Sequence, residues 1–250
     1  MLLSLVIPVY NEAEHLGDFL ELIDAAEFPI SKELVIVDDC SSDRSFEILN
    51  SFSFSSKVAL LRHDINRGKT AALRTGIEKA SGDIVGIQDA DFEYDPKDIP
   101  SLIEPIISGR ADVCFGSRYK SSQQVHRTFH FLVNKLLTTL SNVFSGIYLS
   151  DMETCYKFFR ADLIKNLKLK SMRFGFEPEV TAKVARLKAR VVELPVSYFP
   201  RNYIEGKKIT WRDGVAALWH IFYFNLLESS KDKFKDTMPP SYLSRPSSFL

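Results

Sequence analysis

The sequence predicts an α/β fold with a mostly parallel central sheet that helices cover on both faces. Short apolar runs alternate with amphipathic helical runs through the first half of the chain, the apolar runs are continuous, and polar residues follow most of them. Strands buried on both faces read as continuous apolar runs, and their alternation with helices is typical of α/β domains. At 250 residues the chain is long enough to bury a substantial core.

The first half accounts for most of the predicted sheet. Strands are expected at residues 3–7, 34–37, 58–61, 84–87 and 113–116. Amphipathic runs predict helices at residues 12–25, 43–50, 69–80 and from Pro96 onward, a proline being well placed in a first helical turn.

The second half is less regular. Apolar residues recur at helical spacing over 129–147, and further elements are expected as a strand at 156–159, a helix at 178–187, a strand at 190–194 and a helix at 211–227. We predict one domain over residues 1–227. Residues 228–250 are charged and then rich in proline and serine, which predicts a flexible tail.

Composition argues against several classes of function. Lysine plus arginine equals aspartate plus glutamate, 32 against 32, so no overall charge favours nucleic-acid binding. Cys40, Cys114 and Cys155 are scattered and form no Cys-x-x-Cys pair. This usage suits a reducing compartment and argues against a disulfide framework or a structural zinc site.

The sequence contains no run long enough to cross a bilayer. The nearest, residues 215–227, is too short and contains His220 and Asn225. The amino terminus enters a strand without a basic leader or a cleavable apolar segment. We therefore expect a cytoplasmic protein that is soluble or bound peripherally at the cytoplasmic face of a membrane.

The most informative motif is Asp89-Ala90-Asp91, which follows the expected strand at 84–87 and is followed by Glu93. Ligands of parallel sheets sit outside the carboxyl ends of the strands. Two carboxylates at such an end suit a hard cation, because Mg²⁺ takes one or two protein carboxylates and fills its remaining positions with phosphate and water. Other polar clusters follow the neighbouring strands and converge on the same edge: Tyr10-Asn11-Glu12, Asp38-Asp39 and Gly116-Ser117-Arg118.

The order of these motifs resembles that of family-2 glycosyltransferases. The resemblance covers residues 3–227 and rests on Ile7-Pro8-Val9-Tyr10-Asn11-Glu12, Ile36-Val37-Asp38-Asp39-Cys40-Ser41, Asn66-Arg67-Gly68-Lys69 and Asp89-Ala90-Asp91. Two later motifs narrow it to the dolichyl- or polyprenyl-phosphate mannosyltransferase branch: Gly116-Ser117-Arg118-Tyr119 and Pro195-Val196-Ser197-Tyr198-Phe199 with Arg201 and Lys207.

This resemblance implies a GT-A fold, a nucleotide-sugar donor such as GDP-mannose or UDP-glucose, a divalent cation (Mg²⁺ or Mn²⁺) and inversion at the anomeric carbon. Asp91 would bind the cation with help from Glu93. A carboxylate such as that of Asp39 suits ribose hydroxyls, because it accepts two hydrogen bonds. The implied nucleotide contacts are Pro8, Tyr10, Glu12, Val37, Asp39, Asp89 and Ala90.

The resemblance also implies a set of cationic contacts. Arg118 would meet the donor diphosphate or the acceptor phosphate, since a guanidinium is a planar fork suited to phosphate. Arg127 would bind the acceptor phosphate, and Arg201 and Lys207 would close over the diphosphate. Ile204 stands where the branch usually has glycine, so Lys208 is an alternative to Lys207.

The predicted function is transfer of a hexose, mannose favoured, from a nucleotide-sugar to a polyprenyl or dolichyl phosphate, with Asp91, Arg118 and Asp151 in catalysis. One alternative is an inverting transferase that glycosylates a saccharide or protein hydroxyl, for which Asp151 or Glu153 is the candidate base. Another is a non-catalytic nucleotide-binding partner of a membrane protein.

Two features keep more than one interpretation. Lys69 is either a solvated lysine at a helix start or a donor contact. The apolar positions within 129–147 and 215–227 belong either to the core or to a surface that contacts the membrane. A separate membrane subunit could provide the contact with the membrane instead.

Overall fold

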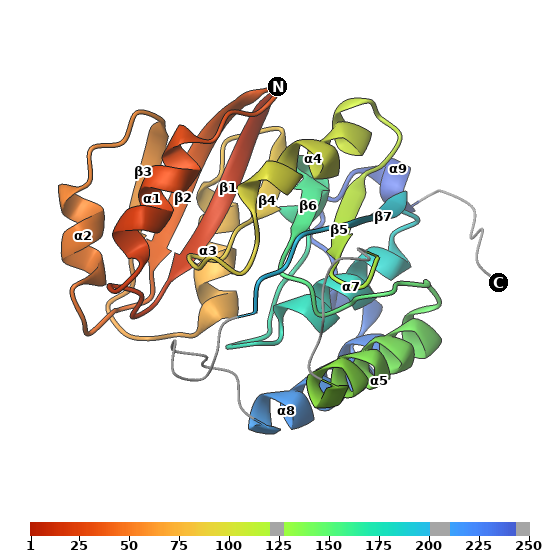
Figure 1. The fold of residues 1–250 in the computed structure, drawn as a ribbon. Helices are drawn as coiled ribbons and strands as arrows, with labels where there is room; N and C mark the ends of the chain where they lie inside the picture. The colour runs from red at the N-terminus through yellow and green to blue at the C-terminus, as the bar shows by residue number, and fades with distance from the viewer. Residues whose placement is uncertain (121–127, 201–210, 244–250) are drawn as a thin grey trace.

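A computed structural model describes residues 1–120, 128–200 and 211–243 and confirms the predicted α/β fold. One seven-stranded sheet with the order β3-β2-β1-β4-β6-β5-β7 forms its centre (Figure 1). Its strands are β1 (Leu2–Val9), β2 (Ser31–Asp38), β3 (Lys57–Arg62), β4 (Ile84–Ile87), β5 (Val113–Ser117), β6 (Lys157–Arg160) and β7 (Val191–Pro195). All neighbouring strands are parallel except β6, which runs antiparallel to both β4 and β5.

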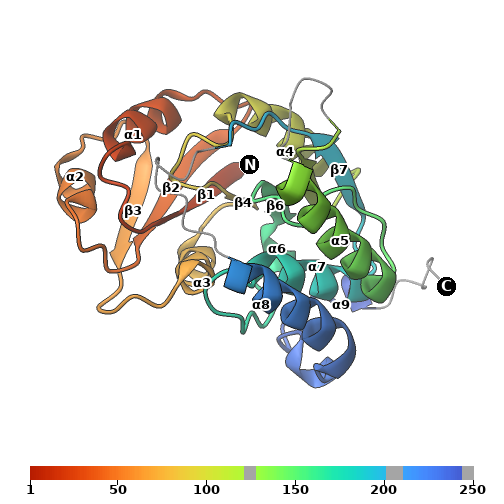
Figure 2. The same ribbon diagram turned by 60° about the horizontal axis from the view of Figure 1, so that its bottom comes forward.

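Helices cover both faces of this sheet, with α1, α2 and α4 on one face and α3 and α7 on the other (Figures 1 and 2). The longer helices are α1 (Leu16–Ala25), α2 (Ser45–Ser51), α3 (Lys69–Lys79), α4 (Ile99–Ile107), α5 (Thr128–Ser145), α7 (Phe176–Arg186) and α8 (Trp211–Phe222). The 3₁₀ turn Pro96–Asp98 leads into α4, and the π-helical turn Tyr223–Leu227 continues α8. Figure 2 shows α5 and α8 side by side, outside α7.

Two glycines allow the close approaches on which this packing depends. A Cβ at Gly86 in β4 would lie 2.3 Å from the ring of Phe158 in β6. A Cβ at Gly76 in α3 would lie 2.4 Å from Val6 in β1. Each distance is well inside van der Waals contact, so α3 can pack on β1 and β6 can pair with β4 only because these positions carry no side chain.

The expectation of a flexible tail from residue 228 is wrong for residues 228–243. Glu228, Lys233, Met238 and Tyr242 are buried, and the 3₁₀ turn Ser230–Asp232 and the short helix α9 (Pro240–Leu243) lie in this segment. Two of the charged side chains that suggested solvation, Glu228 and Lys233, are instead buried, and Lys233 Nζ donates to the backbone carbonyl of Glu228 at 2.8 Å. Residues 228–243 thereby pack back onto the domain, beside the short helix α6 (Ala161–Ile164), where the Tyr242 hydroxyl contacts Asp162.

The carboxyl ends of β1, β2, β4 and β5 share one edge of the sheet. Because β6 is antiparallel, its first residue lies at that same edge, and so does the loop 149–156 that leads into it. The predicted polar clusters are therefore joined by a segment that strand order alone did not place there. This edge carries the candidate site.

Candidate active site

The loops after β1 and β2 are bound to each other. The backbone N–H of Asn11 donates to Ser41 Oγ at 3.0 Å, and that of Glu12 donates to Ser45 Oγ at 2.9 Å. Asn11 and Cys40 have φ values of 51° and 59°, a backbone conformation that non-glycine residues rarely adopt. The two loops form one fixed wall, and strain of this kind gathers at ligand-binding sites.

The predicted nucleoside contacts occupy different depths in this wall. Tyr10 is 38% exposed, whereas Val37 is fully buried. Pro8 and Glu12 are half-buried. The Tyr10 side chain is thus accessible to a ligand, whereas the side chain of Val37 belongs to the core.

Asp39 is buried and accepts three hydrogen bonds from the protein. Its Oδ1 accepts from His63 Nδ1 at 2.7 Å and from the backbone N–H of Arg67 at 2.9 Å. Its Oδ2 accepts from the backbone N–H of Gly68 at 2.7 Å. The carboxylate therefore fixes the turn that begins α3, in addition to any contact with a ligand.

Lys69, at the first position of α3, reaches across to the acidic motif. Its Nζ lies 2.8 Å from the carboxylate of Asp89 and 3.9 Å from Glu177 in α7. Burial would lower the pKa of this lysine, but the charge of Asp89 and then those of Cys155 and Glu177 raise it well above its ordinary value. Lys69 is thus a fixed cation that holds Asp89, and the interpretation as a solvated lysine is wrong.

Asp91 and Glu93 lie in the turn after β4, where a metal-bound diphosphate would be expected. The backbone N–H of Glu93 donates to Asp91 Oδ1 at 3.0 Å, which orients the Asp91 carboxylate. The Glu93 carboxylate lies 3.2 Å from the Tyr198 hydroxyl. Within the described residues no cluster of three or more histidine, cysteine or acidic side chains could hold a metal. One oriented carboxylate nevertheless fits Mg²⁺ or Mn²⁺ that a diphosphate carries, because such ions take most of their ligands from phosphate and water.

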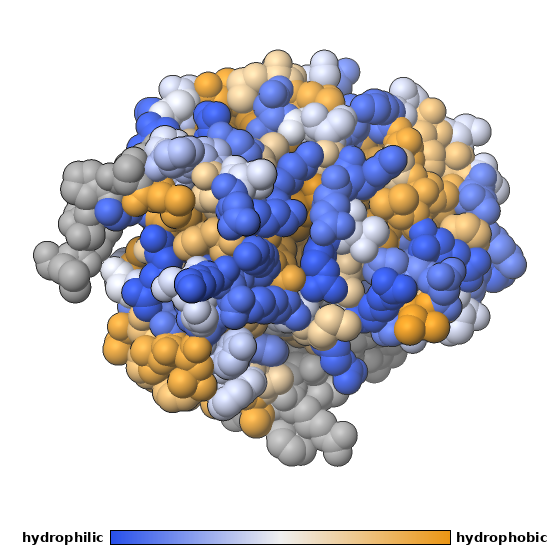
Figure 3. Space-filling view, turned by 180° about the vertical axis from the view of Figure 1, so that it is seen from behind, coloured by the Kyte–Doolittle hydropathy of each residue, from blue (hydrophilic) through white to orange (hydrophobic). Residues whose placement is uncertain are grey.

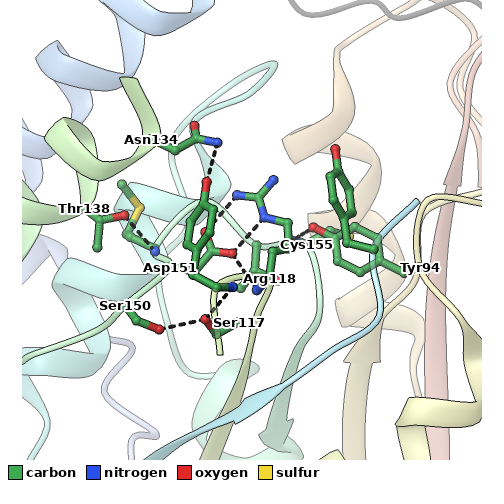
Figure 4. A network of polar contacts seen from close by, with 12 residues as sticks. Tyr94, Ser117, Arg118, Asn134, Thr138, Ser150, Asp151 and Cys155 are labelled. Atoms are coloured by element: carbon green, nitrogen blue, oxygen red, sulfur yellow. Dashed lines mark hydrogen bonds and ion pairs between the residues drawn. The ribbon is translucent and has the colours of Figure 1, made fainter. Parts of the chain in front are cut away.

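Arg118 and Asp151 form a buried, bidentate ion pair at the end of β5 (Figure 4). Arg118 Nε and Nη2 each lie 2.7 Å from a carboxylate oxygen of Asp151, and the Arg118 backbone N–H donates to Oδ2 at 3.0 Å. Burial would raise the pKa of Asp151, but the charge and hydrogen bonds of Arg118 bring it below the ordinary value. Asp151 is therefore an orienting anion for Arg118 and is poorly suited to take a proton.

The loop that carries Asp151 is held from two sides. From α5, Thr138 Oγ1 accepts from the backbone N–H of Met152 at 3.1 Å, and the Asn142 side-chain amide exchanges two hydrogen bonds with the backbone of Leu149. From β7, Glu193 accepts from the backbone N–H groups of Ser150 and Asp151. Figure 4 shows Thr138 of α5 pointing toward this loop.

The neighbouring Glu153 and Lys157 have shifted pKa values. Burial first, and then the charge of Glu177, raise the pKa of Glu153 to about 8. Burial lowers the pKa of Lys157, whose Nζ donates to the backbone carbonyls of Met152 and Thr154 at 2.8 Å. Glu153 is therefore largely protonated at neutral pH.

Most of the predicted site residues are thus brought to one edge, and three are left undescribed. Arg127, Arg201 and Lys207, with the alternative Lys208, lie outside the described residues. His63, Glu177 and Glu193 were missed by the sequence analysis. His63 directly follows β3, so the strand-end pattern that identified Asp39 also indicated this residue.

Residues 4–168 match the family model for glycosyl transferase family 2. The dolichol-phosphate mannosyltransferase of Pyrococcus furiosus is 31% identical over 211 residues, which is 83% of this chain and 59% of that protein. The dodecaprenyl-phosphate galacturonate synthase of Rhizobium johnstonii is 30% identical over 80% of this chain and 60% of its own length. The chain therefore spans about three-fifths of these relatives.

Solved structures show the same fold at lower identity. Glucosyl-3-phosphoglycerate synthase from Mycobacterium tuberculosis, solved with Mn²⁺, UDP and glucosyl-3-phosphoglycerate, has a TM-score of 0.66 at 16% identity. The match covers 91% of this chain and 81% of that one. Together with the match over residues 4–168, this similarity shows that the chain belongs to glycosyl transferase family 2 and has the GT-A fold.

Proposed function

We propose that this protein transfers a hexose, mannose favoured, from a nucleotide-sugar to a polyprenyl phosphate. The observation that carries the proposal is the convergence of Asp39, Asp91 and the Arg118–Asp151 pair on one edge of the sheet. A donor nucleotide, its diphosphate and an anionic acceptor would each meet a fitting group there. The names of the relatives support the acceptor class, since both denote polyprenyl-phosphate sugar transferases.

On the donor side, the wall formed by the loops after β1 and β2 would hold the nucleoside, with Tyr10 and Asp39 at the edge. Lys69 fixes Asp89 beside the diphosphate position. Asp91, oriented by the Glu93 backbone, would hold Mg²⁺ or Mn²⁺, with Glu93 as a second ligand. When bound, the cation would neutralise charge on the departing nucleoside diphosphate.

On the acceptor side, no strong protein base is needed. A phosphate monoester has a second pKa of about 6 and is already largely ionised at neutral pH. Its oxygen attacks the anomeric carbon from the face opposite the leaving group, which would invert the configuration. Arg118, held in place by Asp151, would position this phosphate or the donor diphosphate, so that catalysis consists mainly of positioning and charge stabilisation.

A lipid acceptor requires contact with a membrane, and α5 has an unusual distribution of side chains that supports such contact. From this helix Asn134, Thr138 and Asn142 bond to the site and Leu137 packs into the core, whereas several other apolar residues are exposed. Exposed apolar side chains on α5, α8 and the turn after it are Leu132, Leu136, Val143, Val215, Leu218, Trp219, Phe222, Leu226 and Leu227. Seen from behind, an apolar area lies at the lower left, on the side of the molecule where α5 and α8 lie (Figure 3).

We infer that this outward face binds the surface of the membrane that contains the acceptor, or a membrane subunit that takes its place. An amphipathic helix binds a bilayer in this way when its apolar face inserts at the level of the headgroups. Within the described residues, no helix is long and apolar enough to span a bilayer. Peripheral contact through α5 and α8 is therefore the arrangement that we propose.

The alternative of a hydroxyl acceptor is less favoured. A hydroxyl needs a base, yet Asp151 is bound on both oxygens by Arg118. Glu153, with its pKa raised to about 8, is largely protonated at neutral pH. A non-catalytic role is also less favoured, because the charged pairs of the site are intact.

Donor binding tests the proposal. Calorimetry should compare GDP-mannose with UDP-glucose in the presence of Mg²⁺ or Mn²⁺, on the wild type and on Asp91→Ala. We expect metal-dependent binding of one donor, with GDP-mannose preferred, and loss of that binding in the variant. Absence of binding of either donor by the wild type, with or without metal, would contradict the proposal.

A further inference from the structure

His63 lies between two side chains and bonds to both. Its Nδ1 is 2.7 Å from Asp39 Oδ1, and its Nε2 is 2.9 Å from Thr75 Oγ1 in α3. The imidazole is 6% exposed, so these contacts are shielded from solvent. His63 directly follows β3 and thus connects three elements: the end of β2, the end of β3 and the middle of α3.

The pattern of donors assigns a direction to the pair. The Asp39 carboxylate accepts only, and it also accepts the backbone N–H groups of Arg67 and Gly68. His63 Nδ1 must therefore carry a proton, and in the neutral imidazole Nε2 accepts the Thr75 hydroxyl. His63 thus determines where Asp39 Oδ1 points, and Asp39 in turn fixes the turn at residues 66–68.

The turn at residues 66–68 leads directly into Lys69, and the Lys69 ammonium forms an ion pair with the Asp89 carboxylate. The nitrogen–oxygen distance is 2.8 Å, and both side chains are largely buried. A shift of Asp39 would loosen the start of α3 and move the cation that orients the first carboxylate of Asp89-Ala90-Asp91. His63, Asp39, Lys69 and Asp89 therefore form a continuous series of contacts along the edge, from β3 to β4.

We propose that His63 is a positioning residue for the donor nucleotide site and acts through Asp39 and the turn at residues 66–68. It does not itself contact the donor. Its Nδ1–H donates to Asp39, and this bond sets both the Asp39 carboxylate and the Lys69–Asp89 pair for nucleotide binding. The effect on donor binding rests on the proposed function, whereas the effect on the turn does not.

Two substitutions at this position separate the Nδ1 bond from the space that the ring fills. In asparagine the side-chain nitrogen is bonded to Cγ, as Nδ1 is in histidine. His63→Asn can therefore still donate to Asp39. Glutamine carries its nitrogen one carbon farther out, so His63→Gln retains the reach of Nε2 toward Thr75 but not the bond to Asp39. Glutamine is also the larger of the two and fills the site better.

The first readout is hydrogen–deuterium exchange of residues 64–70, which needs no ligand. We expect faster exchange in His63→Gln than in wild type, because the amides of Arg67 and Gly68 lose an oriented acceptor, and protection close to wild type in His63→Asn. Thr75→Val removes only the contact between Thr75 Oγ1 and His63 Nε2, so its exchange should resemble that of His63→Asn. Equal protection in the two His63 variants, or better protection in the glutamine variant, would overturn the proposal.

The second readout is donor affinity, measured by calorimetry with the nucleotide-sugar that the wild type binds. We expect the dissociation constant to rise about tenfold in His63→Gln and less than threefold in His63→Asn, with a larger effect on the donor KM than on kcat. A wild type that binds no nucleotide-sugar would contradict the proposed function, while the exchange result would still decide the role of His63. Unequal exchange with equal donor affinities would remove the donor site from the proposal and so overturn it.

Discussion

Arg118 and Asp151 are both buried and are joined by two side-chain hydrogen bonds of 2.7 Å. The two residues are 33 positions apart in the sequence. Among the contacts described above, each forms its main ion pair with the other. The pair changes the interpretation of Asp151 from a candidate base to the anchor of a phosphate-binding arginine.

Asp151→Asn should therefore destabilise the fold as well as slow the reaction. Removing one partner of a buried ion pair costs about 3–5 kcal/mol, because the remaining charge is left without compensation. Denaturant unfolding measures this loss. Glu104→Gln, which breaks the exposed pair with Arg110, is the control and should cost less than about 1 kcal/mol. An Asp151→Asn protein of wild-type stability that has lost all activity would instead indicate a general base.

Glu153 should make stability depend on pH. Its pKa is raised from 4.5 to about 8 in the folded protein, so between these values the folded state holds a proton that the unfolded chain has released. Stability from this group is therefore lost as pH rises through that window. Glu153→Gln does not titrate, and its advantage in melting temperature over wild type should grow between pH 5 and pH 8, by on the order of 5 °C. The exposed Glu14→Gln serves as control, and parallel pH curves for wild type and Glu153→Gln would refute the assignment.

Thr138 on α5 should matter for turnover more than for donor binding. Thr138→Val keeps the shape of the side chain but leaves the buried N–H of Met152 without its acceptor, at a cost of about 1–3 kcal/mol. Loosening this loop should lower kcat roughly tenfold, since Asp151 is the adjacent residue. Thr138→Ser retains the hydroxyl and should keep most of the activity. Steady-state kinetics on both variants decides the matter, and equal kcat values would show that the hydrogen bond has no part in positioning Asp151.

The outward face of α5 should be needed for binding to vesicles. Burying an apolar side chain of this size contributes about 1.5–3 kcal/mol, so the double substitution of Leu132 and Leu136 by serine should weaken vesicle binding by more than tenfold. Co-sedimentation with vesicles that contain polyprenyl phosphate measures this. Ile65→Ser, at an apolar position of similar exposure in the loop after β3, should bind normally. If the double variant sediments as well as wild type, α5 does not contact the membrane.

The sequence was most informative where burial imposes a pattern. The apolar runs at 3–7, 34–37 and 84–87 are strands because both of their faces are covered. The polar residues that follow these strands meet at one edge of the sheet, because the carboxyl ends of parallel strands lie together. The direction of β6 could not be predicted, since a short apolar run reads the same in both directions.

Pairings between distant residues were also beyond prediction. Arg118 and Asp151 were both candidates for the site, but the sequence could not show that they form an ion pair with each other. The same limit applies to Lys69 with Asp89 and to Asp39 with His63. The error at residues 228–243 had a different cause: a charged segment was taken as solvated, although Glu228 packs against the buried Lys183 at 3.2 Å.

The most direct test of the proposed reaction is transfer of labelled sugar into the organic phase. Protein, GDP-[¹⁴C]mannose, Mg²⁺ and vesicles that contain polyprenyl phosphate should yield a lipid-linked sugar that extracts into solvent and is released by mild acid, with no product from Asp91→Ala. UDP-[¹⁴C]glucose is run in parallel to identify the donor. Label that stays in the aqueous phase with either donor, from a protein shown to bind that donor, would contradict transfer to a polyprenyl phosphate.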